Sequence, residues 1–102
     1  MIHVIATIDV VAGRRDAVLA EFHRIAPLVR AEAGCLEYGP AVDLASGAPS
    51  QIALRADVVT VVEKWESLDA LRAHFTAPHM LEYQAKVKDL IERRAIHVLS
   101  PA

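Results

Sequence analysis

Apolar side chains occupy every second position of the first segment, residues 2–11. Successive side chains of a β-strand point to opposite faces, so this period of two predicts a strand with one apolar face. Three later segments are also predicted to be strands: 35–44, 58–65 and 94–100. Residues 45–49 are predicted to form a loop, whereas 51–57 fit either a short strand or an irregular flap.

Between the first two strands the apolar period changes to alternating steps of four and three residues, which predicts a helix. Its apolar face consists of Val18, Phe22, Ile25 and Val29. Gly34 is predicted to end this helix, because glycine readily adopts the left-handed conformation found after a helix C-terminus. Pro27 lies inside the helix and cannot donate a backbone hydrogen bond, so a kink is expected about one turn before it.

Two shorter helices are predicted after the strand over 58–65. Ser67 is suited to cap the first of them, which carries Leu68, Leu71 and Phe75. Thr76 is predicted to cap the second, with Pro78 in its first turn. The apolar face of this second helix consists of Met80, Tyr83, Val87 and Leu90 or Ile91.

The order of elements is therefore β-α-β-β-α-β, with the second helical region in two pieces. This order predicts an α+β, ferredoxin-like split βαβ fold, in which helices cover one face of a four-stranded antiparallel sheet. Residues 1–102 have the length of a single domain. Apolar residues make up 54% of the chain and lie on both faces of the strands, so the bare sheet face is expected to pair with a second copy as a homodimer.

The charge of the chain is small and evenly distributed. There are 11 basic and 13 acidic residues, giving a net charge of −2, so nucleic acid is not an expected partner. The longest apolar stretches are far shorter than the roughly 20 residues of a membrane helix, and a cytoplasmic protein is expected. Cys35 is the only cysteine, and we expect it to be a small core residue.

A family pattern surrounds the third strand and the helices after it. It consists of Glu63-Lys64-Trp65-Glu66-Ser67, Leu71, Ala73-His74 and Thr76-Ala77-Pro78-His79-Met80. Through these residues the chain resembles the antibiotic biosynthesis monooxygenase superfamily. The turn at Gly13 and the junction 32–35 also fit, and the final strand and tail, 96–101, are most similar to the bacterial quinol monooxygenases.

This resemblance implies a dimeric α+β barrel and a reaction that requires no cofactor. The implied substrates are molecular oxygen and a dihydroxylated aromatic such as a quinol. Members that degrade haem carry an Asn near the end of the first strand, where this chain has Ala6, so haem degradation is disfavoured. Two alternatives remain: a non-catalytic protein that binds a small aromatic ligand in a stress response, and an isomerase of a small signalling metabolite.

Oxidation of a quinol without metal or flavin needs a base, hydrogen bonds to the resulting anion and an apolar enclosure. His74 is the leading candidate for the base, because imidazole titrates closest to neutral pH. His79 lies in the first turn of the next helix, where a neutral imidazole could bind a substrate oxygen or fasten the helix junction. The two histidines do not have the i, i+4 spacing of a metal pair on one helix, so no zinc site is expected.

Three aromatic residues complete the candidate site. Trp65 ends the third strand beside the pattern, and its indole could form a flat wall for an aromatic ligand or belong to the core. Tyr38 and Tyr83 could each offer a phenol to a substrate oxygen, or pack at a rim. The pocket is expected between the sheet and the helices, near Trp65 and His74.

Glu63 shares the Trp65 face of its strand by alternation. A carboxylate in this position is expected to pair with a cation such as Arg55 or Arg72 rather than perform acid-base chemistry. Phosphate-binding, dinucleotide-binding and nucleophile motifs are not found in the sequence.

Overall fold

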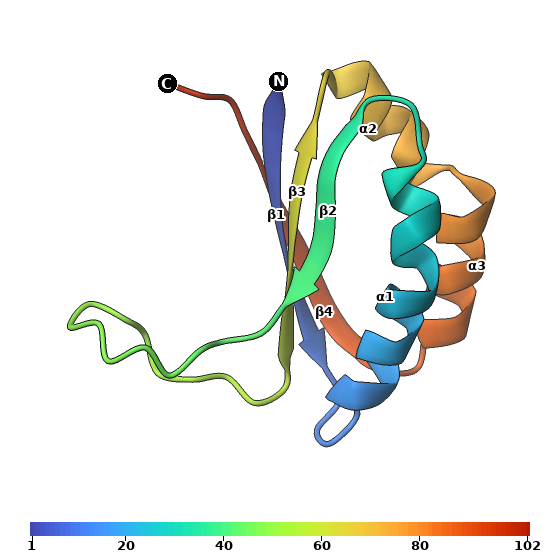
Figure 1. The fold of residues 1–102 in the computed structure, drawn as a ribbon. Helices are drawn as coiled ribbons and strands as arrows, with labels where there is room; N and C mark the ends of the chain where they lie inside the picture. The colour runs from blue at the N-terminus through green and yellow to red at the C-terminus, as the bar shows by residue number, and fades with distance from the viewer.

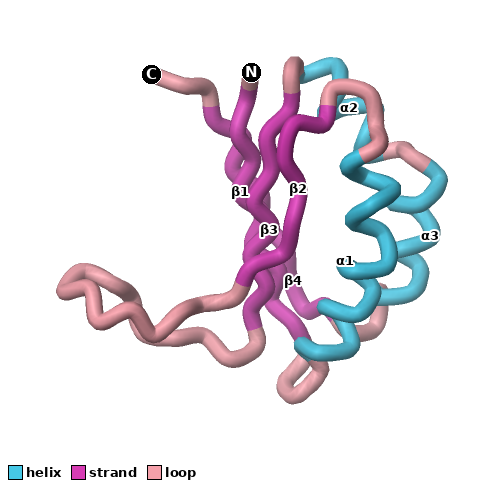
Figure 2. Tube along the Cα trace, viewed as in Figure 1, coloured by secondary structure: helices cyan, strands magenta, loops and turns pink.

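The computed structural model describes all 102 residues of the chain. The elements, labelled in Figure 1, follow in the order β1 (Ile2–Val10), α1 (Arg15–Arg30), β2 (Cys35–Ala41), β3 (Val58–Trp65), α2 (Leu68–Phe75), α3 (Pro78–Val87) and β4 (Ile91–Leu99). The strands form one antiparallel sheet in the order β2-β3-β1-β4. All three helices lie on one face of this sheet, as Figures 1 and 2 show, and the predicted α+β ferredoxin-like fold is confirmed.

The core lies between the helices and the sheet. Alternate residues of β1 and β3 point toward the helices and are buried, which confirms the period of two. The predicted apolar face of α1 is also confirmed, since Val18, Phe22, Ile25 and Val29 are all buried. The helix is continuous through Pro27. Glu63 and Trp65 are both buried on the helix-facing side of β3, as the alternation predicted.

The starts of α3 and β4 differ from the predicted ones. Helix α3 is preceded by Ala77 rather than Thr76, whose hydroxyl instead bonds the Ala73 carbonyl at the end of α2. Strand β4 begins at Ile91, because this residue pairs with Val10 beyond an irregularity in the β1–β4 ladder. The apolar period alone does not distinguish Ile91 in a strand from Ile91 on a continued helix.

Strand β2 ends at Ala41, and residues 42–57 form an arm that is neither helix nor strand. The Asp43 carboxylate accepts hydrogen bonds from Nε and Nη2 of Arg55, both at 2.9 Å, and so ties the two sides of the arm together. The arm projects away from the sheet on the side opposite the helices (Figures 1 and 2). The predicted continuation of the second strand to residue 44 is therefore wrong, and the flap interpretation of 51–57 is the one that holds.

Candidate functional site

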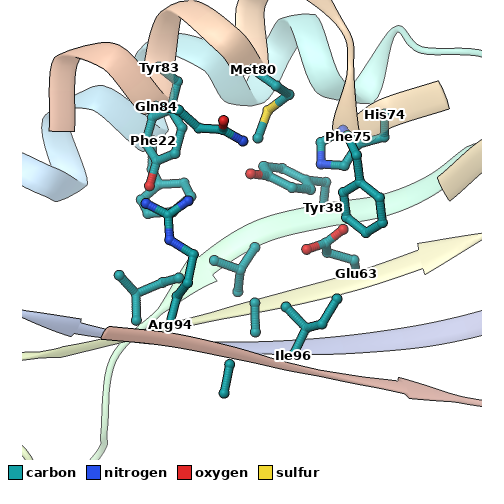
Figure 3. A pocket seen from close by; sticks show the side chains of 14 residues that line it. Phe22, Tyr38, Glu63, His74, Phe75, Met80, Tyr83, Gln84, Arg94 and Ile96 are labelled. Atoms are coloured by element: carbon teal, nitrogen blue, oxygen red, sulfur yellow. The ribbon is translucent and has the colours of Figure 1, made fainter. Parts of the chain in front are cut away.

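A cavity of about 320 Å³ lies between the sheet and the helices. Ten of its 14 lining residues are hydrophobic, and they come from all four strands and all three helices. Figure 3 shows polar side chains at both ends of this cavity, with His74, Tyr38 and Glu63 at one end and Arg94, Gln84 and Tyr83 at the other. Pockets of this kind, apolar with a few placed polar groups, bind small organic molecules.

His74 lies in the last turn of α2 and is only 3% exposed. Its Nδ1 is 2.9 Å from Oε2 of Glu32, in the turn between α1 and β2. Because a carboxylate only accepts hydrogen bonds, Nδ1 carries the hydrogen, and Nε2 is the free acceptor of the neutral ring. The ring is also held from the sides, with the Trp65 ring centroid 4.7 Å away and the Tyr38 centroid 5.6 Å away.

Glu32 joins two histidines. The same Oε2 atom lies 2.7 Å from Nε2 of His79, so one carboxylate oxygen accepts hydrogen bonds from both imidazoles. Backbone bonds hold Glu32 in place: its N–H donates to the Val29 carbonyl, and its own carbonyl accepts from Cys35. The sequence pattern places Glu32 at a family junction but does not indicate its role, because His74 is 42 positions away along the chain.

The turn that carries Glu32 requires a glycine. Gly34 has φ +82°, a conformation that L side chains rarely adopt, and an added Cβ would lie 2.6 Å from the Ala70 Cβ on α2. The Gly34 carbonyl also accepts a hydrogen bond from the Glu66 N–H at the end of β3. This close approach brings the α1–β2 turn against α2, which positions Glu32 beside His74.

Glu63 is a buried carboxylate in the cavity wall. It is 6% exposed and accepts a hydrogen bond from Trp65 Nε1 at 2.9 Å. Burial raises the pKa of Glu63, while the Trp65 hydrogen bond and His74 act in the opposite direction. The expected pairing with a cation is wrong, since Arg55 pairs with Asp43 and Arg72 with Asp69.

Two of the three predicted aromatic residues reach the cavity, and one does not. Tyr38 and Tyr83 line the cavity, whereas Trp65 is fully buried and packs behind His74 and Glu63 without reaching the lining. The expectation that Trp65 contacts a ligand is corrected to a supporting position, because its indole is enclosed on all sides. Burial raises the pKa of the Tyr38 phenol, so it is a neutral hydrogen-bond donor.

His79 does not line the cavity. It lies in the first turn of α3 and is hydrogen-bonded to Glu32, so in place of the predicted contact with substrate it links α3 to the α1–β2 turn. No group of three or more His, Cys, Asp or Glu side chains is arranged to hold a metal ion. None of the helices is long and apolar enough to cross a membrane.

The fold and the site together define a ferredoxin-like domain with a carboxylate–imidazole pair at an apolar cavity. The model of the antibiotic biosynthesis monooxygenase family matches residues 1–86, and the chain belongs to this family. The chain is 40% identical over 103 aligned positions to the "Probable quinol monooxygenase YgiN" of Escherichia coli (strain K12), covering 99% of this chain and 98% of that protein.

Solved structures agree with the fold. Rv0793 from Mycobacterium tuberculosis is 30% identical with a TM-score of 0.79, over 99% of this chain and 94% of that one. PA3566 from Pseudomonas aeruginosa is 26% identical with a TM-score of 0.82, over 99% of this chain and 93% of that one. The resemblance identified from the sequence pattern is therefore confirmed.

Proposed function

We propose that the protein is a cofactor-independent monooxygenase that oxidises a quinol with molecular oxygen. The observation that carries this proposal is the His74 imidazole, whose Nδ1 is bound by Glu32 while the ring lines an apolar cavity. This arrangement leaves Nε2 as the base for a phenolic proton. The similarity to a probable quinol monooxygenase and the family membership support the same reaction.

The reaction needs no external reductant, because the quinol supplies every electron. One quinol and one O2 give one hydroxyquinone and one water. The diol loses two electrons on becoming a quinone, and the ring carbon loses two more when its C–H bond is replaced by C–O. These four electrons reduce both oxygen atoms, one of which enters the product while the other leaves as water.

The first step is proton transfer from a quinol hydroxyl to His74 Nε2. The Glu32 carboxylate, 2.9 Å from Nδ1, stabilises the imidazolium that forms. The quinolate then transfers an electron to O2, and the resulting superoxide and semiquinone combine at a ring carbon. Loss of that carbon's proton and cleavage of the O–O bond release water and leave the new carbonyl, which tautomerises to the hydroxyquinone.

The cavity wall suits this chemistry. The neutral Tyr38 phenol can donate a hydrogen bond to the quinolate oxygen, and Figure 3 shows its hydroxyl pointing into the cavity. The hydrophobic lining keeps water away from the anion and from reduced oxygen.

Oxygen consumption with a panel of reduced naphthoquinones tests the proposal. The wild-type protein, treated with chelator, should consume oxygen well above the rate of spontaneous oxidation, and His74→Gln should abolish the excess. His23→Gln is the matched control, because His23 is exposed on α1. Ligand binding without oxygen consumption would instead indicate a binding protein, and anaerobic turnover an isomerase; either result would overturn the proposal.

We also propose that the helix-free face of the sheet pairs with a second copy of the chain. This face carries Ile5, Val62 and Leu99 among its outward side chains, and Val62 and Leu99 are exposed. The arm projects on the same side and exposes Leu44, Ile52 and Leu54, so one copy would present apolar side chains of both the sheet face and the arm to the other (Figure 1).

Light scattering after size exclusion tests this pairing. The wild-type protein should have the mass of a dimer, and Val62→Lys should have the mass of a monomer. Leu81→Lys is the control, since Leu81 is exposed on α3, on the opposite side of the molecule. A monomeric wild-type protein, or a dimeric Val62→Lys, would contradict the pairing.

A further inference from the structure

The end of the cavity away from His74 has polar groups that the proposed oxidation does not use. Arg94 comes from β4, while Tyr83 and Gln84 come from α3. Figure 3 shows the Tyr83 hydroxyl directed toward the Arg94 guanidinium, while the Gln84 amide points toward Met80 and the middle of the cavity. We call these three residues the anion subsite.

Tyr83 supplies the strongest indication of a missing ligand. The residue is only 4% exposed, and its hydroxyl is the one buried side-chain polar atom without a hydrogen-bond partner. Its ring is fixed by packing against Phe22, with the centroids 4.9 Å apart. A buried hydroxyl without a partner is unfavourable, and such groups in native proteins call for a partner from solvent or a ligand.

Arg94 also has no partner within the chain, although it is exposed whereas Tyr83 is buried. Among the ion pairs of the chain none involves Arg94, whereas its neighbour Arg93 points to the other face of the sheet and donates to Asp9 at 2.9 Å. Arg94 is opposite Ile8 of β1 and, like Ile8, lines the cavity. A positive charge and a neutral hydroxyl donor therefore share one end of the cavity, with His74 and Glu63 at the other end.

We propose that the anion subsite binds a carboxylate on the substrate, so that the preferred substrates are dihydroxy aromatic acids. The planar guanidinium of Arg94 matches the two oxygens of a carboxylate, and the Tyr83 hydroxyl and the Gln84 amide supply further donors. The diol then lies toward His74 at the opposite end. The position of the diol rests on the proposed function, whereas the binding of the carboxylate does not.

Equilibrium binding of two unreactive ligands of the same shape tests the subsite by calorimetry. The probes are 2-naphthoate, which carries the carboxylate, and 2-naphthamide, which is neutral. The wild-type protein should bind the naphthoate about ten- to a hundredfold more tightly, as expected for charged hydrogen bonds. Arg94→Gln should remove this preference while leaving the affinity for the naphthamide unchanged, which also shows that the variant is folded.

Arg93→Gln is the matched control, because it makes the same charge change at the next residue, on the other face of the sheet. It should retain the preference for naphthoate. Tyr83→Phe should weaken naphthoate binding without lowering the thermal midpoint, since the lost hydroxyl has no partner in the protein. Equal affinity of the wild-type protein for both ligands, no binding of naphthoate, or the same loss in Arg93→Gln and Arg94→Gln would overturn the proposal.

These measurements need neither oxygen nor turnover. A preference for naphthoate in a protein that consumes no oxygen would retain the subsite and reject the oxidation. Oxygen consumption with a neutral quinol by a protein that shows no preference for naphthoate would retain the oxidation and reject the subsite.

Discussion

Replacing Glu32 with Gln separates the charge of the carboxylate from its shape. Oε2 of Glu32 lies 2.9 Å from Nδ1 of His74 and 2.7 Å from Nε2 of His79, and the side chain is 13% exposed. Glutamine keeps an acceptor oxygen in this position but removes the negative charge. The imidazolium formed when His74 takes a proton then loses its counter-charge.

The size of the effect follows from the kind of hydrogen bond that is lost. A hydrogen bond to a charged group contributes about 1.5–3 kcal/mol and a neutral one about 0.5–1.5, so the substitution costs the imidazolium about 1–2 kcal/mol. If proton transfer limits the rate, kcat/KM should fall about five- to thirtyfold. The loss should appear in oxygen consumption with a reduced naphthoquinone at limiting concentration.

Glu37→Gln provides the control for this substitution. Glu37 is exposed, pairs with Lys64 at 3.3 Å and lies outside the cavity lining, so it makes the same charge change away from the site. Thermal unfolding of both variants separates a loss of activity from a loss of fold. A kcat/KM of Glu32→Gln within about twofold of wild type, in a folded protein, would refute the role assigned to Glu32.

Two further predictions concern stability. Burial raises the pKa of Glu63 above its ordinary value of 4.5, so the folded protein binds this proton more tightly than the unfolded chain does. The folded protein therefore loses stability as pH rises from the pKa of Glu63 in the unfolded chain to its higher pKa in the folded protein. Glu63→Gln keeps the acceptor for Trp65 and does not titrate. The thermal midpoint of this variant minus that of wild type should therefore be larger at about pH 7 than at about pH 4, and a difference that does not change with pH would contradict this. Gly34→Ala should destabilise by about 2–4 kcal/mol in chemical denaturation, against about 1 kcal/mol for Gly13→Ala, because both glycines have positive φ but only Gly34 would place a Cβ against Ala70. Equal losses in the two variants would show that the α1–β2 turn is not closely packed on α2.

The sheet and the helices could be predicted because apolar periodicity reports directly which side of an element is buried. Alternation along 58–65 correctly assigned Glu63 and Trp65 to one face. The alternation could not show that Trp65 is enclosed while Glu63 reaches the cavity, because how deeply a side chain is buried depends on which residues pack over the strand. The arm over 42–57 has no helix or strand, and its path depends on a contact between Asp43 and Arg55 that no local pattern indicates.

The site was predictable only in part, for a similar reason. His74 could be singled out by residue type and family pattern, and the cavity does lie between the sheet and the helices. Its partner Glu32 is brought to it by the close approach of Gly34 to Ala70, which depends on the packing of two distant turns. Tyr83 could be predicted as an aromatic on the α3 face, but the isolation of its hydroxyl is a property of the folded cavity alone.

The most direct test of the account is to follow oxygen-18 gas into the product. With a reduced naphthoquinone, the wild-type protein should yield a hydroxyquinone that carries one labelled oxygen atom, with the second label in water. His74→Gln should lose this product while His23→Gln retains it. Unhydroxylated quinone and hydrogen peroxide as the only products, or the same labelled product from His74→Gln, would contradict the assignment of quinol oxygenation to this cavity.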